Sequence, residues 1–248
     1  MPYAGYDALS SVRIVLVETT HPGNIGAVAR AMKNMELTDL ALVAPKIFPS
    51  EQATARAAGA DDVLGAARLY AELPAAIADC RLIIGASARL RTIPWPQLTP
   101  RECAEMVGTQ APGNRTAILF GREHSGLTNE ELEHCHFLLH IPSNPEFSSL
   151  NIAAAVQLVA YELYGALRFR ADASHTAPLL ASSAEMESFF EHLETTLWHI
   201  GFLHARKSAP SIMRRLRRIF HRSRIEEREV HLLRGILTTM QYRLKGGP

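Results

Sequence analysis

The chain has 248 residues, of which 47% are hydrophobic and 21% are charged, as expected for a globular protein with one sizeable core and an appendage. No apolar run reaches the length of a membrane span, and the N-terminus lacks the basic and apolar regions of a signal peptide. The three cysteines, Cys80, Cys103 and Cys135, are scattered and odd in number. This usage favours reduced thiols in the cytoplasm.

The net charge of +1 conceals an uneven distribution along the chain. Residues 1–165 contain 12 Lys and Arg against 17 Asp and Glu, whereas residues 166–248 contain 14 against 8. A basic tail on a mildly acidic body indicates that the tail meets a polyanion.

Apolar, often β-branched runs alternate with helical segments over the first two thirds of the chain. The expected strands are residues 12–17, 40–43, 81–86, 116–120 and 137–141, with a short strand or turn beginning at Val63. The expected helices are residues 24–35, 51–58, 73–78, 101–107, 129–134 and 152–167. Pro22 and Gly23 are expected to form a turn before the first helix. The alternation predicts an α/β fold whose mostly parallel sheet is covered on both faces.

The remainder of the chain is different in character. Residues 171–183 are rich in Ala and Ser, which is typical of a flexible linker. The pattern then becomes helical throughout, with helices expected at residues 184–205, 210–221 and 225–244. We therefore expect an α/β domain over residues 1–168, a linker over 169–183 and a basic helical domain over 184–248.

A ligand-binding corner is predicted by residues 137–168, which combine a short strand, a loop rich in Pro, Ser and Asn, and a long Ala-rich helix. Free backbone N–H groups gather at the start of such a helix. Ser149 alone could simply cap the helix, which is the usual role of a serine there. The loops at residues 21–30, 121–126 and 86–88 also follow strands, so they could meet this corner at the carboxyl edge of the sheet.

Several residues in these loops suit a phosphate or a reacting oxyanion. Asn24 and Arg30 lie almost two helical turns apart, so a substrate could lie between them. Arg30 offers a fork of donors, although a lone arginine is more often solvated or salt-bridged. Gly121 follows an apolar strand and would let a ligand approach the backbone closely. Glu123 could orient Arg30 or Asn24, or could serve only as a cap or a surface charge.

Two other kinds of site are disfavoured. The glycines near residue 24 do not form the GxGxxG pattern, so a dinucleotide cofactor is weakly supported. His134, Cys135 and His136 are adjacent and point in different directions, and no second Cys/His cluster lies nearby. No metal site is expected, because the spacing does not match known zinc sites.

The tail carries the strongest concentration of positive charge. No acidic residue interrupts the segment from 206 to 224, and its basic residues form a candidate RNA-binding face: Arg206, Lys207, Arg214, Arg215, Arg217, Arg218, Arg222 and Arg224. Such a face would bind phosphates with a steep salt dependence. The alternative is a solvated helix face.

Three segments, NIGAVAR, LFGREHSGL and IPSNPEFSSLNIAAAVQLVAYEL, occur in the order of the three motifs of the SPOUT ribose 2′-O-methyltransferases. Residues 11–165 strongly resemble that family. The resemblance implies a SPOUT fold with a C-terminal trefoil knot, S-adenosylmethionine bound in the knot, and a homodimer whose active sites lie near the interface. It also implies methylation of a tRNA ribose, most specifically a cytidine or uridine at position 32 of the anticodon loop.

Matched residue by residue, the resemblance assigns a catalytic set of Arg30, Asn24, Glu123, Ser149 and Asn151. It assigns cofactor contacts to Ala86, Ser87, Ala88, Gly121, Ile141, Ser148, Ser149 and Leu150. We expect Arg30 to position and acidify the 2′-hydroxyl rather than take its proton, because a guanidinium does not readily deprotonate. Three alternatives stay open: another tRNA or rRNA site, a non-catalytic RNA-binding dimer, and a nucleotide-dependent oxidoreductase.

Overall fold

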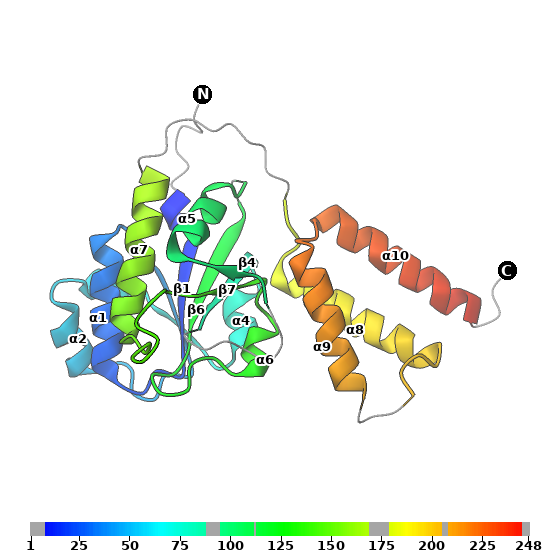
Figure 1. Cartoon of the computed structure of the whole chain (residues 1–248), viewed down its shortest axis with the longest axis horizontal. Helices are drawn as coiled ribbons and strands as arrows, with labels where there is room; N and C mark the ends of the chain where they lie inside the picture. Colours follow the sequence, from blue (N-terminus) through cyan, green and yellow to red (C-terminus); the bar gives the residue numbers. More distant parts are fainter. Residues whose placement is uncertain (1–7, 88–94, 112, 169–178, 205–207, 245–248) are drawn as a thin grey trace.

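The computed structural model describes residues 8–87, 95–111, 113–168, 179–204 and 208–244, which form an α/β domain and a separate group of three helices (Figure 1). The strands are β1 (Val12–Val17), β2 (Asp39–Val43), β3 (Arg68–Tyr70), β4 (Cys80–Ala86), β5 (Gln97–Leu98), β6 (Arg115–Phe120) and β7 (Phe137–Leu139). A 3-10 turn, Ala8–Ser11, precedes α1 (Pro22–Asn34), α2 (Glu51–Ala57), α3 (Asp61–Gly65), α4 (Leu73–Ile77), α5 (Pro100–Gly108), α6 (Asn129–Leu132) and α7 (Ile152–Arg168). The C-terminal helices are α8 (Ser183–His199), α9 (Ala209–Arg222) and α10 (Glu227–Leu244).

The seven described strands form one sheet in the order β3-β2-β1-β6-β4-β7-β5, and every described pairing is parallel. The α/β fold with a parallel sheet is therefore confirmed. The last strand, β7, lies between β4 and β5, both of which precede it in the chain. This order gathers the loops after β1, β4, β6 and β7 at one edge. The trefoil knot stays a prediction.

Both faces of the sheet are buried, as continuous apolar strands require. Val12, Ile14 and Leu16 of β1 belong to a core shared with α1, α2, α5 and α7 on one face. Val15 and Val17 face the opposite way, into a second core with α4 and Leu132 of α6. Along the first face, α1 lies between α2 and α7, so the first and third motifs are neighbours (Figure 1).

The structure corrects several expected element boundaries. Val63 lies in α3, and the strand begins later, at Arg68. Pro22 and Gly23 are the first residues of α1 rather than a turn, consistent with the preference of proline for the first helical position. Helix α8 ends at His199 rather than continuing to residue 205, because Gly201 adopts a positive φ of 76°.

The three C-terminal helices have a core of their own. Phe189 and Phe190 of α8 contact Phe220 of α9, and Val230 and Leu237 of α10 complete the cluster. Helix α8 begins with a capping box, in which the side chains of Ser182 and Glu185 hydrogen-bond to each other's backbone N–H groups. No helix in the described part of the chain is long and apolar enough to cross a membrane.

Candidate active site

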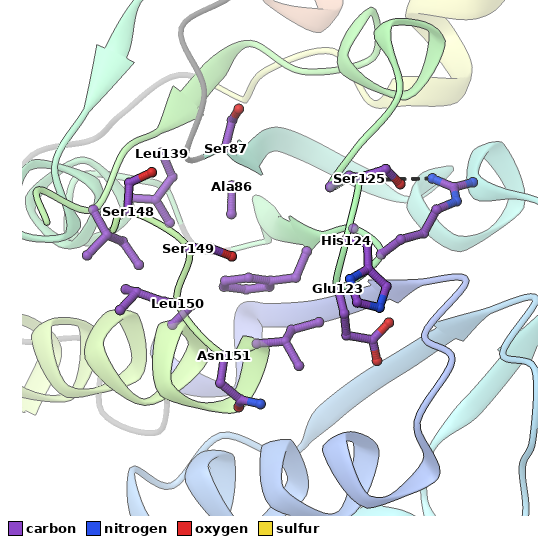
Figure 2. A pocket seen from close by; sticks show the side chains of 17 residues that line it. Ala86, Ser87, Glu123, His124, Ser125, Leu139, Ser148, Ser149, Leu150 and Asn151 are labelled. Atoms are coloured by element: carbon purple, nitrogen blue, oxygen red, sulfur yellow. Dashed lines mark hydrogen bonds between the residues drawn. The ribbon is translucent and has the colours of Figure 1, made fainter. Parts of the chain in front are cut away.

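A cavity of about 480 Å³ opens at the carboxyl edge of the sheet, between the loops that follow β4, β6 and β7 (Figure 2). This volume lies within the range of small-molecule sites. Its apolar surface comes from Phe120, Leu139 and Ile141. Its polar surface comes from the hydroxyl groups of Ser87, Ser148 and Ser149. The cavity can therefore hold a ligand with both a flat apolar part and a polar end.

The structure brings together most of the residues predicted to hold the cofactor. The cavity is lined by Ala86, Ser87, Gly121, Ile141, Ser148, Ser149 and Leu150. Ala88, the remaining residue of that set, lies outside the described residues. Sequence reasoning missed Phe120, Leu139, His124 and Ser125, which also line the cavity. Their proximity to the motifs was the only signal, since each is next to or within two residues of a predicted site residue.

Glu123 joins the first and second motifs. Its carboxylate accepts hydrogen bonds from Asn24 Nδ2 at 2.9 Å, from Thr20 Oγ1 at 2.8 Å, and from the backbone N–H groups of Thr20 and His21. Burial of this carboxylate works in the opposite direction, but these hydrogen bonds lower the pKa of Glu123 to about 2. Glu123 is therefore an ionised anchor whose oxygens are already occupied.

Asn151 adds the third motif to the same network. Its Nδ2 donates to Asn24 Oδ1 at 3.2 Å, and its Oδ1 accepts from the Ala153 backbone N–H at 2.9 Å. The second bond is an N-cap of α7, so Asn151 is the capping residue. Ser149 does not cap the helix and instead lines the cavity. Asn24, Glu123 and Asn151 thus form one continuous chain across three distant segments.

Gly121 has a structural role in addition to the ligand contact expected of it. A Cβ at this position would lie 2.2 Å from the carbonyl carbon of Gly126 and 2.3 Å from the backbone nitrogen of Leu127. No side chain fits against the backbone at such distances. Gly121 is required by the tight folding of its own loop, in addition to its place in the cavity wall.

Arg122 stabilises this loop through two carboxylates. Its guanidinium contacts Glu18 and Glu131, with nitrogen–oxygen distances of 2.6 and 3.0 Å. Hydrogen bonds to these two carboxylates raise the pKa of Arg122. Sequence reasoning missed this residue, because neither acidic partner lies in the same motif. The loop is therefore held by side chains as well as by its glycines.

Arg30 is the one predicted catalytic residue that the structure leaves apart from the others. It is exposed on α1, about 9 Å further along the helix than Asn24 at 1.5 Å per residue. It is not among the residues lining the cavity, and it makes no hydrogen bond or ion pair within the described ranges. Of the two residues that Glu123 was expected to orient, Arg30 or Asn24, the structure shows Asn24.

The candidate RNA-binding arginines of α9 and the loop after it fall into two groups, those with protein partners and those that are exposed. Arg214 pairs with Glu133 of the α/β domain, and Arg224 donates to Gln110 at 3.2 Å. Arg217 pairs with Glu187 at 2.6 Å and lies 4.5 Å above the ring of Phe190. Arg215 and Arg222 are exposed, and Arg218 is half-buried. Arg206 and Lys207 lie outside the described residues.

His134 and His136 lie at the contact between the two domains, where His134 is beside Glu187 of α8. His136 is buried, and its Nδ1 accepts a hydrogen bond from the backbone N–H of Ile83 at 3.1 Å. Its ring centroid lies 4.8 Å from that of His221 on α9. Burial lowers the pKa of His136 to about 4. In the described part of the chain, no three His, Cys, Asp or Glu side chains gather as metal ligands.

Comparison with known proteins identifies both parts of the chain. Residues 11–161 match the SpoU rRNA Methylase family, and residues 184–248 match the C-terminal domain of tRNA methyltransferase TrmJ. The tRNA (cytidine/uridine-2′-O-)-methyltransferase TrmJ of Photorhabdus laumondii is 50% identical over 94% of this chain and 98% of its own length. A Pseudomonas aeruginosa relative, named as a cytidine/uridine/adenosine enzyme, is 48% identical over 96% of both chains.

A solved structure shares the whole arrangement. The crystal structure of TrmJ from Z. mobilis ZM4 matches with a TM-score of 0.82 and 36% identity, covering 92% of this chain and 98% of that chain. The matches span both domains and nearly the full length of the relatives. The chain therefore belongs to the SpoU methylase family and, within it, to the TrmJ tRNA 2′-O-methyltransferases.

Proposed function

We propose that this protein transfers a methyl group from S-adenosylmethionine to the ribose 2′-hydroxyl of cytidine or uridine at position 32 of tRNA. The observation that carries the proposal is the meeting of Asn24, Glu123 and Asn151 beside a cavity of suitable size. The names of the relatives support tRNA and the 2′-hydroxyl. Position 32 rests on the resemblance of the motifs. Activity on tRNA supports a cytoplasmic location.

The cavity suits the cofactor on chemical grounds. Phe120, Leu139 and Ile141 offer an apolar surface for the adenine, and the serines at 148 and 149 offer polar atoms for the ribose and amino-acid part. S-adenosylmethionine supplies a methyl group that is already electrophilic. The protein therefore has to align the hydroxyl with it and help the hydroxyl lose a proton. Alignment alone can contribute up to about 7–11 kcal/mol in the best cases.

Glu123 does not take the proton in this scheme. Its pKa of about 2 makes it a very weak base at neutral pH, and its oxygens accept from Asn24, Thr20 and His21. Its role is to hold Asn24, and through Asn24 the start of α7. Arg30 is free to contact the RNA, so we assign it to lowering the pKa of the 2′-hydroxyl and positioning it. Water or an RNA phosphate takes the proton.

A homodimer would cover the exposed apolar side chains of α7. Leu158 is 45% exposed and Tyr161 is 62% exposed, and both lie on α7. Helix α7 packs beside α1, which carries Arg30 (Figure 1). Exposed apolar side chains on one helix are typical of an interface between subunits. We propose that two copies pair through this region, which would bring Arg30 into the vicinity of the subunit interface.

The decisive experiment is mass-spectrometric mapping of ribose methylation in unmodified tRNA transcripts incubated with the protein and S-adenosylmethionine. We expect one new 2′-O-methyl group, at residue 32, on transcripts with C32 or U32. A transcript with 2′-deoxyribose at residue 32 is the matched control and should gain none. A methyl group elsewhere would contradict the position alone, whereas no methylation of any tRNA would contradict the activity. A transcript with A32 tests the wider range in the name of the Pseudomonas relative.

A further inference from the structure

Helix α10 exposes an apolar stripe that takes no part in the candidate active site. Leu232 is 66% exposed, Ile236 is 50% exposed and Met240 is 39% exposed. A different side of the helix is the one that packs: Val230 and Leu237, about 100–120° around the helix from Ile236, are buried, and Gln241 donates to Thr196 of α8 at 2.8 Å. In Figure 1, α10 lies at the outer edge of the helical domain, away from the sheet.

The stripe is bounded by two opposite charges on the same side of the helix. At 100° per residue, Glu229 and Arg243 both lie within about 20° of Ile236, and Leu232 and Met240 lie within about 40°. Glu229 and Arg243 are exposed, and neither has an ion-pair partner among the described residues. Glu229 accepts only the backbone N–H of Glu226 at 2.8 Å. Such a face is apolar at its centre and charged at its ends.

The spacing of these residues is symmetric about Ile236. Leu232 and Met240 lie four positions before and after it, and Glu229 and Arg243 lie seven positions before and after it. An antiparallel second copy of α10, centred on Ile236, would therefore set Leu232 against Met240 and Glu229 against Arg243. The seven-residue spacing is the repeat that keeps one seam facing a partner helix.

We propose that α10 pairs with α10 of a second copy of this chain, antiparallel and centred on Ile236. A symmetric interface requires a surface that complements itself, and this register provides both matched apolar pairs and matched charges. A nucleic acid does not suit the stripe, because its three central side chains are aliphatic and offer neither cations nor stacking rings. The contact is separate from the catalytic homodimer and uses none of the site residues.

Cysteine cross-linking of the full-length protein tests this register. The three native cysteines are buried, so they give little background. Ile236→Cys should form a disulfide-linked dimer on a non-reducing gel under mild oxidation, because the residue faces its own copy. Thr238→Cys is the matched control, since Thr238 is exposed but points to the opposite side of the helix. Its yield of linked dimer should be at least about fivefold lower.

Two further sets of variants fix the direction of pairing. Leu232→Cys and Met240→Cys should each link poorly alone and well when combined in one chain. In the Ile236→Cys background, Arg243→Glu should lower the yield, and adding Glu229→Arg should restore it. Equal linking of Ile236→Cys and Thr238→Cys would overturn the self-pairing. Linking of Leu232→Cys alone at the level of Ile236→Cys would overturn the antiparallel register. If Leu232→Ser and Ile236→Ser abolished tRNA binding, and the cysteine variants formed no linked dimer, the stripe would be an RNA-binding surface instead.

Discussion

The two domains use their polar residues in opposite ways. In the α/β domain, Asn24, Glu123 and Asn151 come from three distant segments and converge on one network beside the cavity. In the helical domain, adjacent arginines diverge: Arg214 binds the other domain, while its neighbour Arg215 is exposed. A parallel sheet collects its loops at one edge, whereas a helix spreads consecutive residues around its circumference. A sequence motif therefore marks one site in the first domain, whereas a run of arginines in the second does not mark one face.

The largest effect that we expect concerns Arg30, the predicted catalytic residue that lies outside both the network and the cavity lining. Arg30→Ala should lower the single-turnover rate of methyl transfer by about 100- to 1,000-fold, the usual cost of losing a group that stabilises a developing oxyanion. Binding of tRNA and S-adenosylmethionine should change little, because Arg30 does not line the cavity and makes no hydrogen bond or ion pair among the described residues. Arg30→Lys should also be severely impaired, since lysine lacks the planar fork.

The matched control for Arg30 is Lys33→Ala on the same helix. Lys33 is an exposed cation that lies one turn after Arg30 and pairs with Asp62. It should methylate tRNA normally. Normal turnover by Arg30→Ala would remove Arg30 from the chemistry and leave the network as the whole of the catalytic apparatus.

The next effect concerns the anchor of the network. Glu123→Gln keeps the size of the side chain but replaces charge-assisted hydrogen bonds from Thr20, His21 and Asn24 with neutral ones. We expect the free energy of unfolding to fall by about 1–3 kcal/mol and methyl transfer to fall by about tenfold or more. Thermal melting and single-turnover assays measure the two effects. Glu130→Gln, on the exposed face of α6, is the control. Unchanged melting of Glu123→Gln would show that the network does not depend on charge.

The fold was predictable from sequence where local pattern and tertiary structure agree. The apolar run at 12–17 is a buried central strand, as its continuous hydrophobicity predicts. The two-residue strand β5 lies within a loop broken by prolines, and its pairing with β7 could not be inferred from so short a segment. The end of α8 differs from the sequence expectation because Gly201 stops the helix, although the apolar residues after it favour continuation.

The site was predictable in its members but not in its connections. The motifs named Asn24, Glu123 and Asn151, yet the pairing of Glu123 with Asn24 depends on how two loops meet in space. Arg122 needs partners from two other elements, Glu18 and Glu131, so no local spacing could assign it. The division of the tail arginines depends on which side of α9 meets the α/β domain. The number of arginines in the sequence does not show which of them the packing places at this contact.

The contrast between docked and exposed arginines predicts two distinct defects. Arg215→Ala with Arg222→Ala should weaken tRNA binding and lower the slope of log affinity against log salt by up to about two units, one for each phosphate that is no longer neutralised. Arg214→Ala with Arg217→Ala should instead destabilise the docked helices, because half-buried Glu133 of the α/β domain would lose its arginine and half-buried Glu187 of α8 would keep only His134. Filter binding at several salt concentrations and thermal melting distinguish the two. Equal changes in salt slope for both pairs would contradict the division.

The last effect that we expect is the pH dependence of domain docking. His136 and His221 are buried against each other, and burial lowers the pKa of both below the ordinary value near 6.5, to about 4 for His136. The docked form therefore keeps these rings neutral, while the undocked or unfolded form takes up protons as the pH falls below 6.5. Docking should be unaffected above pH 6.5 and should weaken between pH 6.5 and 4, by about 1.4 kcal/mol per pH unit for one histidine.

The effect of the histidines can be measured separately from that of the neighbouring carboxylate, because the carboxylate titrates at a lower pH. Glu187, which faces His134 and Arg217, has its pKa lowered to about 2 from 4.5, despite burial acting in the opposite direction. Its stabilising effect is therefore lost only below about pH 4.5. Melting temperatures between pH 7 and 5 should fall by a few degrees in the natural protein and by less in His221→Phe, because neither nitrogen of His221 has a partner among the described residues. The exposed His199→Gln is the control. Identical pH profiles for His221→Phe and the natural protein would show that the buried histidines do not govern docking.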